Sequence, residues 1–234
     1  PELIRKLEDV GCDVFIGNPA WQLPGGSHED ELVTHAREAV VLAGTSIRNT
    51  PISRRIMEAS QRLRVIAKYS VGVDDVDVEA ATELGILVTH APTESNCFGV
   101  AETTVMMILA MCKRAMFRDA EVRAGKWREA HQKATYLGAR LSFPVTRTKE
   151  TRYMLRDEQI ALMKPGAIVV NTARGKVIEE AAVARAIERG HLAGAAIDAF
   201  EVEPLPMDSP LRKLGTKVLM SAHSASFNAD GELR

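Results

Sequence analysis

The stretch GAIVVNTARGKVIEEAAVARAIERGHLAGAAIDAF, residues 166–200, contains two short apolar runs with a helical pattern between them. The first run, 166–172, and the last, 194–200, are apolar on both faces, which is typical of strands buried in a parallel sheet. Residues 179–189 between them have the spacing of an amphipathic helix. A strand, a helix and a strand in this order predict a parallel sheet covered by helices.

The same alternation continues on both sides of this unit. A further strand is expected at 217–223, and a single long helix at about 100–124 precedes the unit. The earlier part of the chain carries its own series, with strands expected at 13–17, 39–44, 64–70 and 86–92 and helices at 29–36, 53–59 and 78–84. We therefore expect an α/β protein with two doubly wound parallel sheets joined by a long helix.

The composition is that of an ordinary globular chain of one or two domains, with 234 residues of which 46% are hydrophobic and 26% charged. A net charge of −1 gives no reason to expect nucleic acid or an anionic membrane as a partner. Cys12, Cys97 and Cys112 have neither metal-ligand spacing nor a disulfide pattern, so we expect no metal and a cytoplasmic location. The longest apolar stretch, 105–112, is too short to cross a bilayer.

Polar residues follow the strands expected in the second half of the chain, at the edge where parallel sheets bind ligands. They are an arginine, three carboxylates and a histidine: Arg174, Asp198, Glu201, Glu203 and His223. A guanidinium binds a carboxylate at two points, and a histidine backed by a carboxylate exchanges protons near neutral pH. This set suits the reduction of a 2-keto acid, with the hydride supplied by a cofactor. Hydrolysis by Ser-His-Asp fits less well, because no serine lies in a strand-turn-helix elbow.

Several of these polar residues also have a purely structural interpretation. Arg174 could be a solvated turn residue, although its coincidence with the other strand-end residues favours a substrate anchor. Glu201 is expected to be solvated. The run VDDVDVEAA at 73–81 could suggest a cation site, but its acids fit better as caps of a helix N-terminus. His90 follows a strand without a carboxylate behind it, so we expect it to line a cleft or to face solvent.

The run LMKPGAIVVNTARGKVIEEAAVARAIERGHLAGAAIDAFEVEPLP, followed by SPL and VLMSAHSAS, resembles the D-isomer-specific 2-hydroxyacid dehydrogenases. In the first half, YSVGVDDVDVEAATELGILVTHAP, VAETTVMMILA and GKW are similar to that family's catalytic domain and linking helix, in the same order. The resemblance covers nearly the whole chain. It implies two Rossmann- or flavodoxin-like domains: a substrate domain at 1–97, then the linking helix and a dinucleotide-binding domain at 98–234.

The resemblance also implies roles for individual residues. Arg174 would bind the substrate carboxylate, with His223 as the acid–base and Glu203 as its carboxylate partner. Asp198 would accept a hydrogen bond from the nicotinamide carboxamide. The acid at position 203 favours hydroxyacid chemistry, because the related formate dehydrogenases carry glutamine there. The remaining implied contacts are Thr172, Ala173, Arg174, His223 and Ser226 with NAD or NADP, and Arg174 with the backbone of Ser70, Val71 and Gly72 for the substrate.

One part of the family's pattern does not occur in this sequence. The family carries a G-x-G-x-x-G turn after the long helix, whereas only Gly25 and Gly26 of the 16 glycines here lie within two residues of each other. We therefore expect the second domain to be incomplete as it stands, with a missing segment near 140–143 of about 60 to 80 residues, the size of the absent nucleotide-binding strands and helices. Because the chain opens on Pro1 in a helical pattern, we also expect its true start to lie upstream.

The sequence thus predicts an NAD(P)-dependent oxidoreductase that interconverts a D-2-hydroxy acid and its 2-keto acid. A homodimer is expected, with a small acid as the substrate and neither nucleic acid nor a membrane as a partner. The missing segment leaves open an alternative, a non-catalytic cofactor-sensing or corepressor-like module of the same fold. The choice between NAD and NADP also stays open, because the residue that decides it follows a strand in the absent segment.

Overall fold

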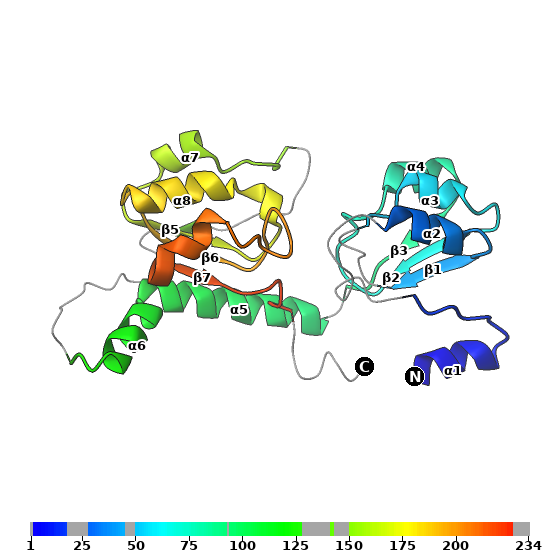
Figure 1. The fold of residues 1–234 in the computed structure, drawn as a ribbon, viewed down its shortest axis with the longest axis horizontal. Coiled ribbons are helices and arrows are strands. Elements are labelled where there is room, and N and C mark those ends of the chain that lie inside the picture. The colour runs from blue at the N-terminus through cyan, green and yellow to red at the C-terminus, as the bar shows by residue number, and fades with distance from the viewer. Residues whose placement is uncertain are drawn as a thin grey trace. The chain divides into compact units, whose positions relative to one another are not determined.

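The computed structural model describes residues 2–17, 28–44, 50–92, 94–127, 141–142 and 150–226. The chain divides into two compact units, Pro1–Pro92 and Thr93–Arg234, and each contains its own parallel sheet (Figure 1). The domain boundary expected at 97/98 falls inside the first helix of the second unit. The prediction of an α/β fold built on parallel sheets is confirmed.

In the first unit, three of the described strands form a sheet in the order β1-β2-β3. They are β1 (Val41–Gly44), β2 (Val65–Lys68) and β3 (Leu87–Thr89), with helices α1 (Glu2–Asp9), α2 (Glu29–Ala36), α3 (Arg54–Glu58) and α4 (Val78–Glu83). Helices α2, α3 and α4 lie over one face of the sheet (Figure 1). Their buried Ala36, Ile56 and Ala80 form a core with Ile66 of β2. Burial of this apolar surface holds the helices on the sheet.

The strand expected at 13–17 is absent, so that prediction is wrong. Phe15 and Ile16 are 68% and 66% exposed, and the Phe15 ring stacks on His35 with the ring centroids 4.2 Å apart. Among the described residues, no strand of the sheet pairs with this segment. An apolar run becomes a strand only where a neighbour accepts and donates its backbone hydrogen bonds, and β1 does not do so here.

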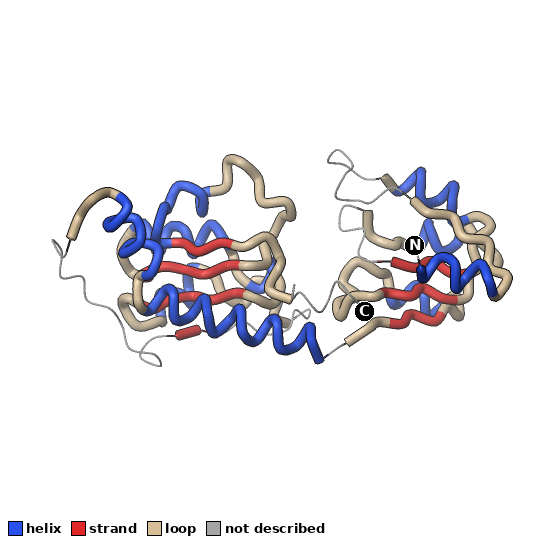
Figure 2. Tube along the Cα trace, turned by 90° about the horizontal axis from the view of Figure 1, so that it is seen from below, coloured by secondary structure: helices blue, strands red, loops and turns tan. Residues whose placement is uncertain are grey.

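In the second unit, four of the described strands form a sheet in the order β4-β5-β6-β7, with every pair parallel. They are β4 (Leu141–Ser142), β5 (Ala167–Asn171), β6 (Leu192–Ile197) and β7 (Val218–Met220). Helices α7 (Asp157–Leu162) and α8 (Glu180–Glu188) cover one face, and α5 (Glu94–Cys112) covers the other (Figures 1 and 2). β5 is buried at every position for this reason. The predicted strand-helix-strand unit is therefore confirmed as β5, α8 and β6.

The long helix expected at 100–124 is two helices, α5 and α6 (Ala115–Arg123), so the single helix was wrong. Arg114 lies between them with a φ of 55°, in the left-handed region that an α-helix cannot continue through. Met107 and Met111 of α5 are buried against the sheet, whereas Met106 is 50% exposed. None of the helices in the described ranges is both long and apolar enough to span a membrane.

The missing segment expected near 140–143 falls partly outside the described residues, because positions 140 and 143 are not among them. Leu141 and Ser142 form β4 and pair with Ile168 and Val169 of β5. The strand that borders β5 thus comes from this part of the sequence.

Candidate active site

The turn after β5 presents Arg174, and a buried asparagine shapes it. The Asn171 amide donates to the carbonyl oxygens of Arg174 and Ala199, at 3.0 and 3.3 Å, and its side-chain oxygen accepts from the Ala173 amide at 3.2 Å. These bonds join the end of β5 to the residues that follow β6. The sequence places Asn171 at the end of this strand, and a buried amide at a strand end signals such a link.

Gly175 is required because the chain passes very close to a second loop at this point. A Cβ placed on Gly175 would lie 1.9 Å from the carbonyl carbon and oxygen of Phe200 and 2.4 Å from the Glu201 nitrogen. Real side-chain atoms do not approach so closely. The glycine therefore brings the backbone beside Arg174 against the segment 200–203, which carries Glu203.

Glu203 and His223 form a hydrogen-bonded pair. The His223 Nδ1 atom lies 2.8 and 3.0 Å from the two carboxylate oxygens of Glu203, and the Phe200 amide donates to Glu203 Oε1 at 3.0 Å. Both side chains are largely buried. A carboxylate at Nδ1 favours the proton on that nitrogen and assigns proton exchange with a ligand to Nε2. The pair is arranged as an acid–base with its supporting carboxylate.

His223 is held in a tight turn by Asp198. The Asp198 carboxylate accepts from the Ser221 hydroxyl at 2.5 Å, the Ser224 amide at 2.9 Å and the Ala225 amide at 3.2 Å. Its carbonyl oxygen accepts from the His223 amide at 2.8 Å, and His223 has a φ of 52°. A buried carboxylate with three donors thus stabilises the unusual backbone that presents the imidazole.

The expectation that Glu201 is solvated is wrong. Its carboxylate accepts from the Glu180 amide at 2.7 Å and from the Tyr153 hydroxyl at 2.8 Å. In return, Glu180 Oε1 accepts from the Glu201 amide at 2.5 Å. Burial raises the pKa of Glu180 from 4.5 to about 7. Sequence reasoning did not single out Glu180 or Tyr153; a carboxylate at the first residue of α8 was the one available signal.

Helix α5 supports both strand-end loops. The hydroxyl groups of Thr104 and Thr172 lie 2.8 Å apart, and Thr103 donates to the Ala225 carbonyl at 3.0 Å. Thr172 and Ala173 thus lie at the end of β5 beside α5. Ser226 directly follows Ala225.

The loop after β2 in the first unit contains Ser70, Val71 and Gly72. The Ser70 hydroxyl donates to the Gly72 carbonyl at 3.2 Å, and His90 Nδ1 lies 3.0 Å from the Val71 carbonyl oxygen. His90 is exposed, and it supports this loop. The contact of the loop with substrate stays a prediction.

The acidic run that follows this loop has structural partners. Asp77 caps α4 by accepting from the Ala80 amide at 2.9 Å, as predicted. Asp75 lies 2.5 Å from the ammonium of Lys68, whose side chain is only 2% exposed. Among the described residues, no group of three or more potential ligands could hold a metal ion.

Comparisons with known proteins agree on one family. The family model for the NAD binding domain of D-isomer specific 2-hydroxyacid dehydrogenases matches residues 138–225. The glyoxylate reductase of Korarchaeum cryptofilum is 31% identical in an alignment 252 residues long, gaps included, and the alignment covers 81% of this chain and 74% of that protein. In the solved structures, the TT0316 protein from Thermus thermophilus has a TM-score of 0.79 and 29% identity, covering 97% of this chain and 87% of that one.

A second relative is longer than this chain. The D-3-phosphoglycerate dehydrogenase of Methanocaldococcus jannaschii is 31% identical, and the match covers 99% of this chain but only 52% of the relative. The chain therefore spans about half the length of that protein. The alignment runs over 288 residues, whereas this chain has 234, so the relative carries residues inside the aligned region that have no counterpart here. The absent glycine-rich turn leads us to expect such a gap.

The polar groups at the ends of β5, β6 and β7 fit the nicotinamide end of a dinucleotide. Asp198 provides a buried carboxylate there, and within the described residues its Oδ2 accepts one hydrogen bond, from the Ala225 amide, which leaves it capacity for a carboxamide donor. The sequence contains no glycine-rich turn for the diphosphate. The fold, the strand-end residues and the relatives agree, and the chain belongs to the D-isomer specific 2-hydroxyacid dehydrogenases, a family of NAD(P)-dependent oxidoreductases.

Proposed function

We propose that this chain interconverts a D-2-hydroxy acid and its 2-keto acid with NAD or NADP. The observation that carries the proposal is the His223–Glu203 pair at 2.8 Å. The segment that bears Glu203 packs against Gly175, the residue after Arg174. A proton donor and a guanidinium are thus supplied by adjacent loops of one sheet edge, as reduction of a keto acid requires.

In the direction of reduction, Arg174 binds the substrate carboxylate and orients the neighbouring ketone. His223 gives the proton on Nε2 to the ketone oxygen, while the Nδ1 proton stays on the Glu203 side and the carboxylate stabilises the imidazolium. When bound, the nicotinamide cofactor would supply the hydride for this reaction. Oxidation of the hydroxy acid is the reverse, with neutral His223 accepting the hydroxyl proton.

The cofactor and substrate contacts divide between the units. Thr172, Ala173, Asp198 and Ser226 would hold the nicotinamide end at the sheet edge of the second unit. The backbone of residues 70–72 in the first unit would bind the substrate. The relatives named glyoxylate reductase and D-3-phosphoglycerate dehydrogenase favour a small substrate, such as glyoxylate, hydroxypyruvate or a phosphorylated hydroxy acid.

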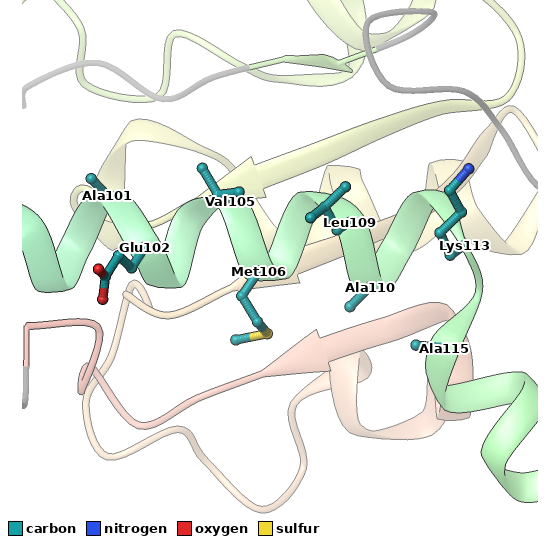
Figure 3. A pocket seen from close by; sticks show the side chains of 8 residues that line it. All are labelled: Ala101, Glu102, Val105, Met106, Leu109, Ala110, Lys113 and Ala115. Atoms are coloured by element: carbon teal, nitrogen blue, oxygen red, sulfur yellow. The ribbon is translucent and has the colours of Figure 1, made fainter.

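We further propose a homodimer in which a second copy covers α5. Val105, Met106 and Leu109 expose apolar surface along this helix, and a groove of about 860 Å³ follows them (Figure 3). Apolar patches of this kind on a helix mark protein interfaces. Light scattering should give twice the monomer mass for the parent protein. The Met106→Glu variant should have the mass of a monomer. A monomeric parent would contradict the dimer.

The free cysteines support a cytoplasmic location.

The test of function is turnover with a matched panel of substrates. The protein, NADH or NADPH, and 2-keto acids are mixed, and the nicotinamide absorbance is followed; aldehydes of equal size without the carboxylate are the control. We expect 2-keto acids to react and the control aldehydes to react poorly. Cofactor binding without turnover of any keto acid would instead support the cofactor-sensing alternative. Failure to bind either cofactor would contradict both.

A further inference from the structure

Glu180 is a buried carboxyl group close to the proposed acid–base pair but outside it. It is 8% exposed, at the first residue of α8. Buried carboxyl groups are costly unless they are hydrogen-bonded or neutral. No step of the proposed reaction uses Glu180, so its position calls for another explanation.

Glu180 and Glu201 form a reciprocal pair of hydrogen bonds. The side chain of each accepts from the backbone amide of the other, at 2.5 Å for the Glu201 amide and 2.7 Å for the Glu180 amide. The Tyr153 hydroxyl donates to the second oxygen of Glu201 at 2.8 Å. The start of α8 is therefore joined to the segment after β6 by two bonds, and Tyr153 adds a third bond to the same segment.

This junction lies two residues from Glu203. The Phe200 amide, next to Glu201 in the chain, donates to Glu203 Oε1. The same oxygen faces His223 Nδ1 at 2.8 Å. A shift of Glu201 would move Phe200 and Glu203 with it, because the segment 200–203 is short. The orientation of the Glu203 carboxylate toward the imidazole thus depends on the bonds that hold Glu201.

The two carboxyl groups of this junction, Glu180 and Glu201, have different surroundings. The Glu201 carboxylate accepts hydrogen bonds from the Glu180 amide and the Tyr153 hydroxyl. Burial raises the pKa of Glu180 to about 7; the hydrogen bond from the Glu201 amide opposes this shift, and the negative charges of Glu201 and Glu203 add to it. Tyr153, Arg156 and Glu179 line a pocket together with Glu201, and His223 contacts Glu203. Burial therefore favours the neutral form of Glu180.

We propose that Glu180 is a positioning residue for the catalytic pair: its carboxyl accepts the Glu201 amide and fixes the segment 200–203 that presents Glu203 to His223. The inference extends the proposed function, and it rests on that function for the catalytic role of the His223–Glu203 pair. Its geometric claim, that Glu180 controls the contact between Glu203 and His223, concerns the protein without cofactor as well.

The inference is tested on the imidazole itself. Glu180→Leu removes the acceptor, so Glu203 should turn away and stabilise the imidazolium less. We expect the titration midpoint of His223, followed by NMR in the cofactor-free chain and assigned with His223→Gln, to move to lower pH by roughly half a unit to one unit. Glu180→Gln keeps an acceptor oxygen and should move it much less. Glu188→Leu, the same change at an exposed position of α8, is the matched control and should leave it unchanged.

Kinetics supply the second measurement. Glu180→Leu should lower kcat for keto-acid reduction about 10-fold and shift its pH profile the same way, with KM changed less than about threefold, because proton transfer and not binding is affected. An unmoved His223 midpoint in a folded Glu180→Leu protein would overturn the inference. An equal shift in Glu180→Gln would also overturn it, since charge alone would then be responsible.

A milder variant keeps the inference testable if Glu180→Leu does not fold. Tyr153→Phe removes only the hydroxyl that donates to Glu201, and it should shift the His223 midpoint in the same direction by a smaller amount. No shift in this variant would then count against the inference. A parent without turnover would contradict the proposed function alone, because the NMR midpoint is measured without substrate.

Discussion

The two units use parallel sheets in different ways. The sheet of the second unit has helices on both faces, and β5 is buried throughout. In the first unit, helices α2, α3 and α4 cover one face, and Val41 and Leu87 on its strands remain exposed. Strand-end loops of the second unit are accordingly held by buried polar side chains, Asn171 and Asp198. A sheet covered on both faces offers the rigid support that proton and hydride transfer require.

The comparison predicts that chemistry resides in the second unit and that the first contributes binding. The loop at 70–72 offers backbone groups, and its neighbouring ion pair, Lys68–Asp75, is structural. Arg174, Glu203 and His223 instead project side chains suited to bind a carboxylate and exchange a proton. Substitutions in the two units should therefore affect kcat and KM differently.

The largest effect is expected from His223→Ala. Loss of a positioned proton donor should lower kcat for keto-acid reduction by about 10²- to 10⁴-fold. Cofactor affinity, measured by fluorescence titration, should change little, because the turn around His223 is held by Asp198. Turnover within a few-fold of the parent would remove His223 from the mechanism.

Arg174→Lys should have the next largest effect. Lysine is a single point charge that cannot make two parallel bonds to a carboxylate, so KM should rise and kcat should fall, together by roughly 10²-fold in kcat/KM. The measurement is kcat/KM for matched substrates with and without the carboxylate. Equal losses on both substrates would mean that Arg174 supports the fold or the cofactor instead.

Lys68→Met tests the first unit. Removing one partner leaves Asp75 without its counterion and should destabilise the protein by about 2–4 kcal/mol. We expect KM to rise several-fold as the loop at 70–72 loosens, with kcat within about threefold of the parent. Lys68→Met with Asp75→Leu should recover much of the stability, measured by thermal unfolding. A large fall in kcat with an unchanged KM would contradict the division of roles.

The core of the second unit was predictable because each of its strands is encoded by a continuous run of apolar residues. The apolar runs around β5, β6 and β7 are continuous in the sequence, and parallel topology brings their polar ends together. The structure places Glu203 on His223 although 20 residues separate them. The single feature needed was that both follow neighbouring strands. The roles of these residues in catalysis stay predictions until the variants are measured.

The features that sequence reasoning missed depend on distant partners. Residues 13–17 look like a strand, but no neighbour among the described strands pairs with them. The break between α5 and α6 comes from the left-handed backbone of Arg114, a residue type that gives no such signal. Glu201 looks solvated beside Glu203, yet it contacts Tyr153, 48 residues earlier in the chain. The spacing of apolar residues along the chain does not indicate contacts between residues so far apart in the sequence.

The smallest expected effect concerns stability and pH. Burial raises the pKa of Glu180 to about 7 from its ordinary 4.5, so the folded protein holds a proton there that the unfolded chain releases. Between these two pH values the folded state binds more protons than the unfolded state, and its stability falls as pH rises. The contribution of protonated Glu180 to the stability of the folded state is lost completely only above pH 7.

Glu180→Gln cannot titrate, so relative to the parent it should gain stability as pH rises from 5 to 8. The expected gain is about 1–2 kcal/mol, below the limit set by the full shift. Urea unfolding at several pH values measures it, and Glu188→Gln at an exposed position should show no such trend. A difference between Glu180→Gln and the parent that stays constant with pH would mean that Glu180 is ionised in the folded protein. The neutral carboxyl would then be excluded, while the hydrogen bond from the Glu201 amide would remain.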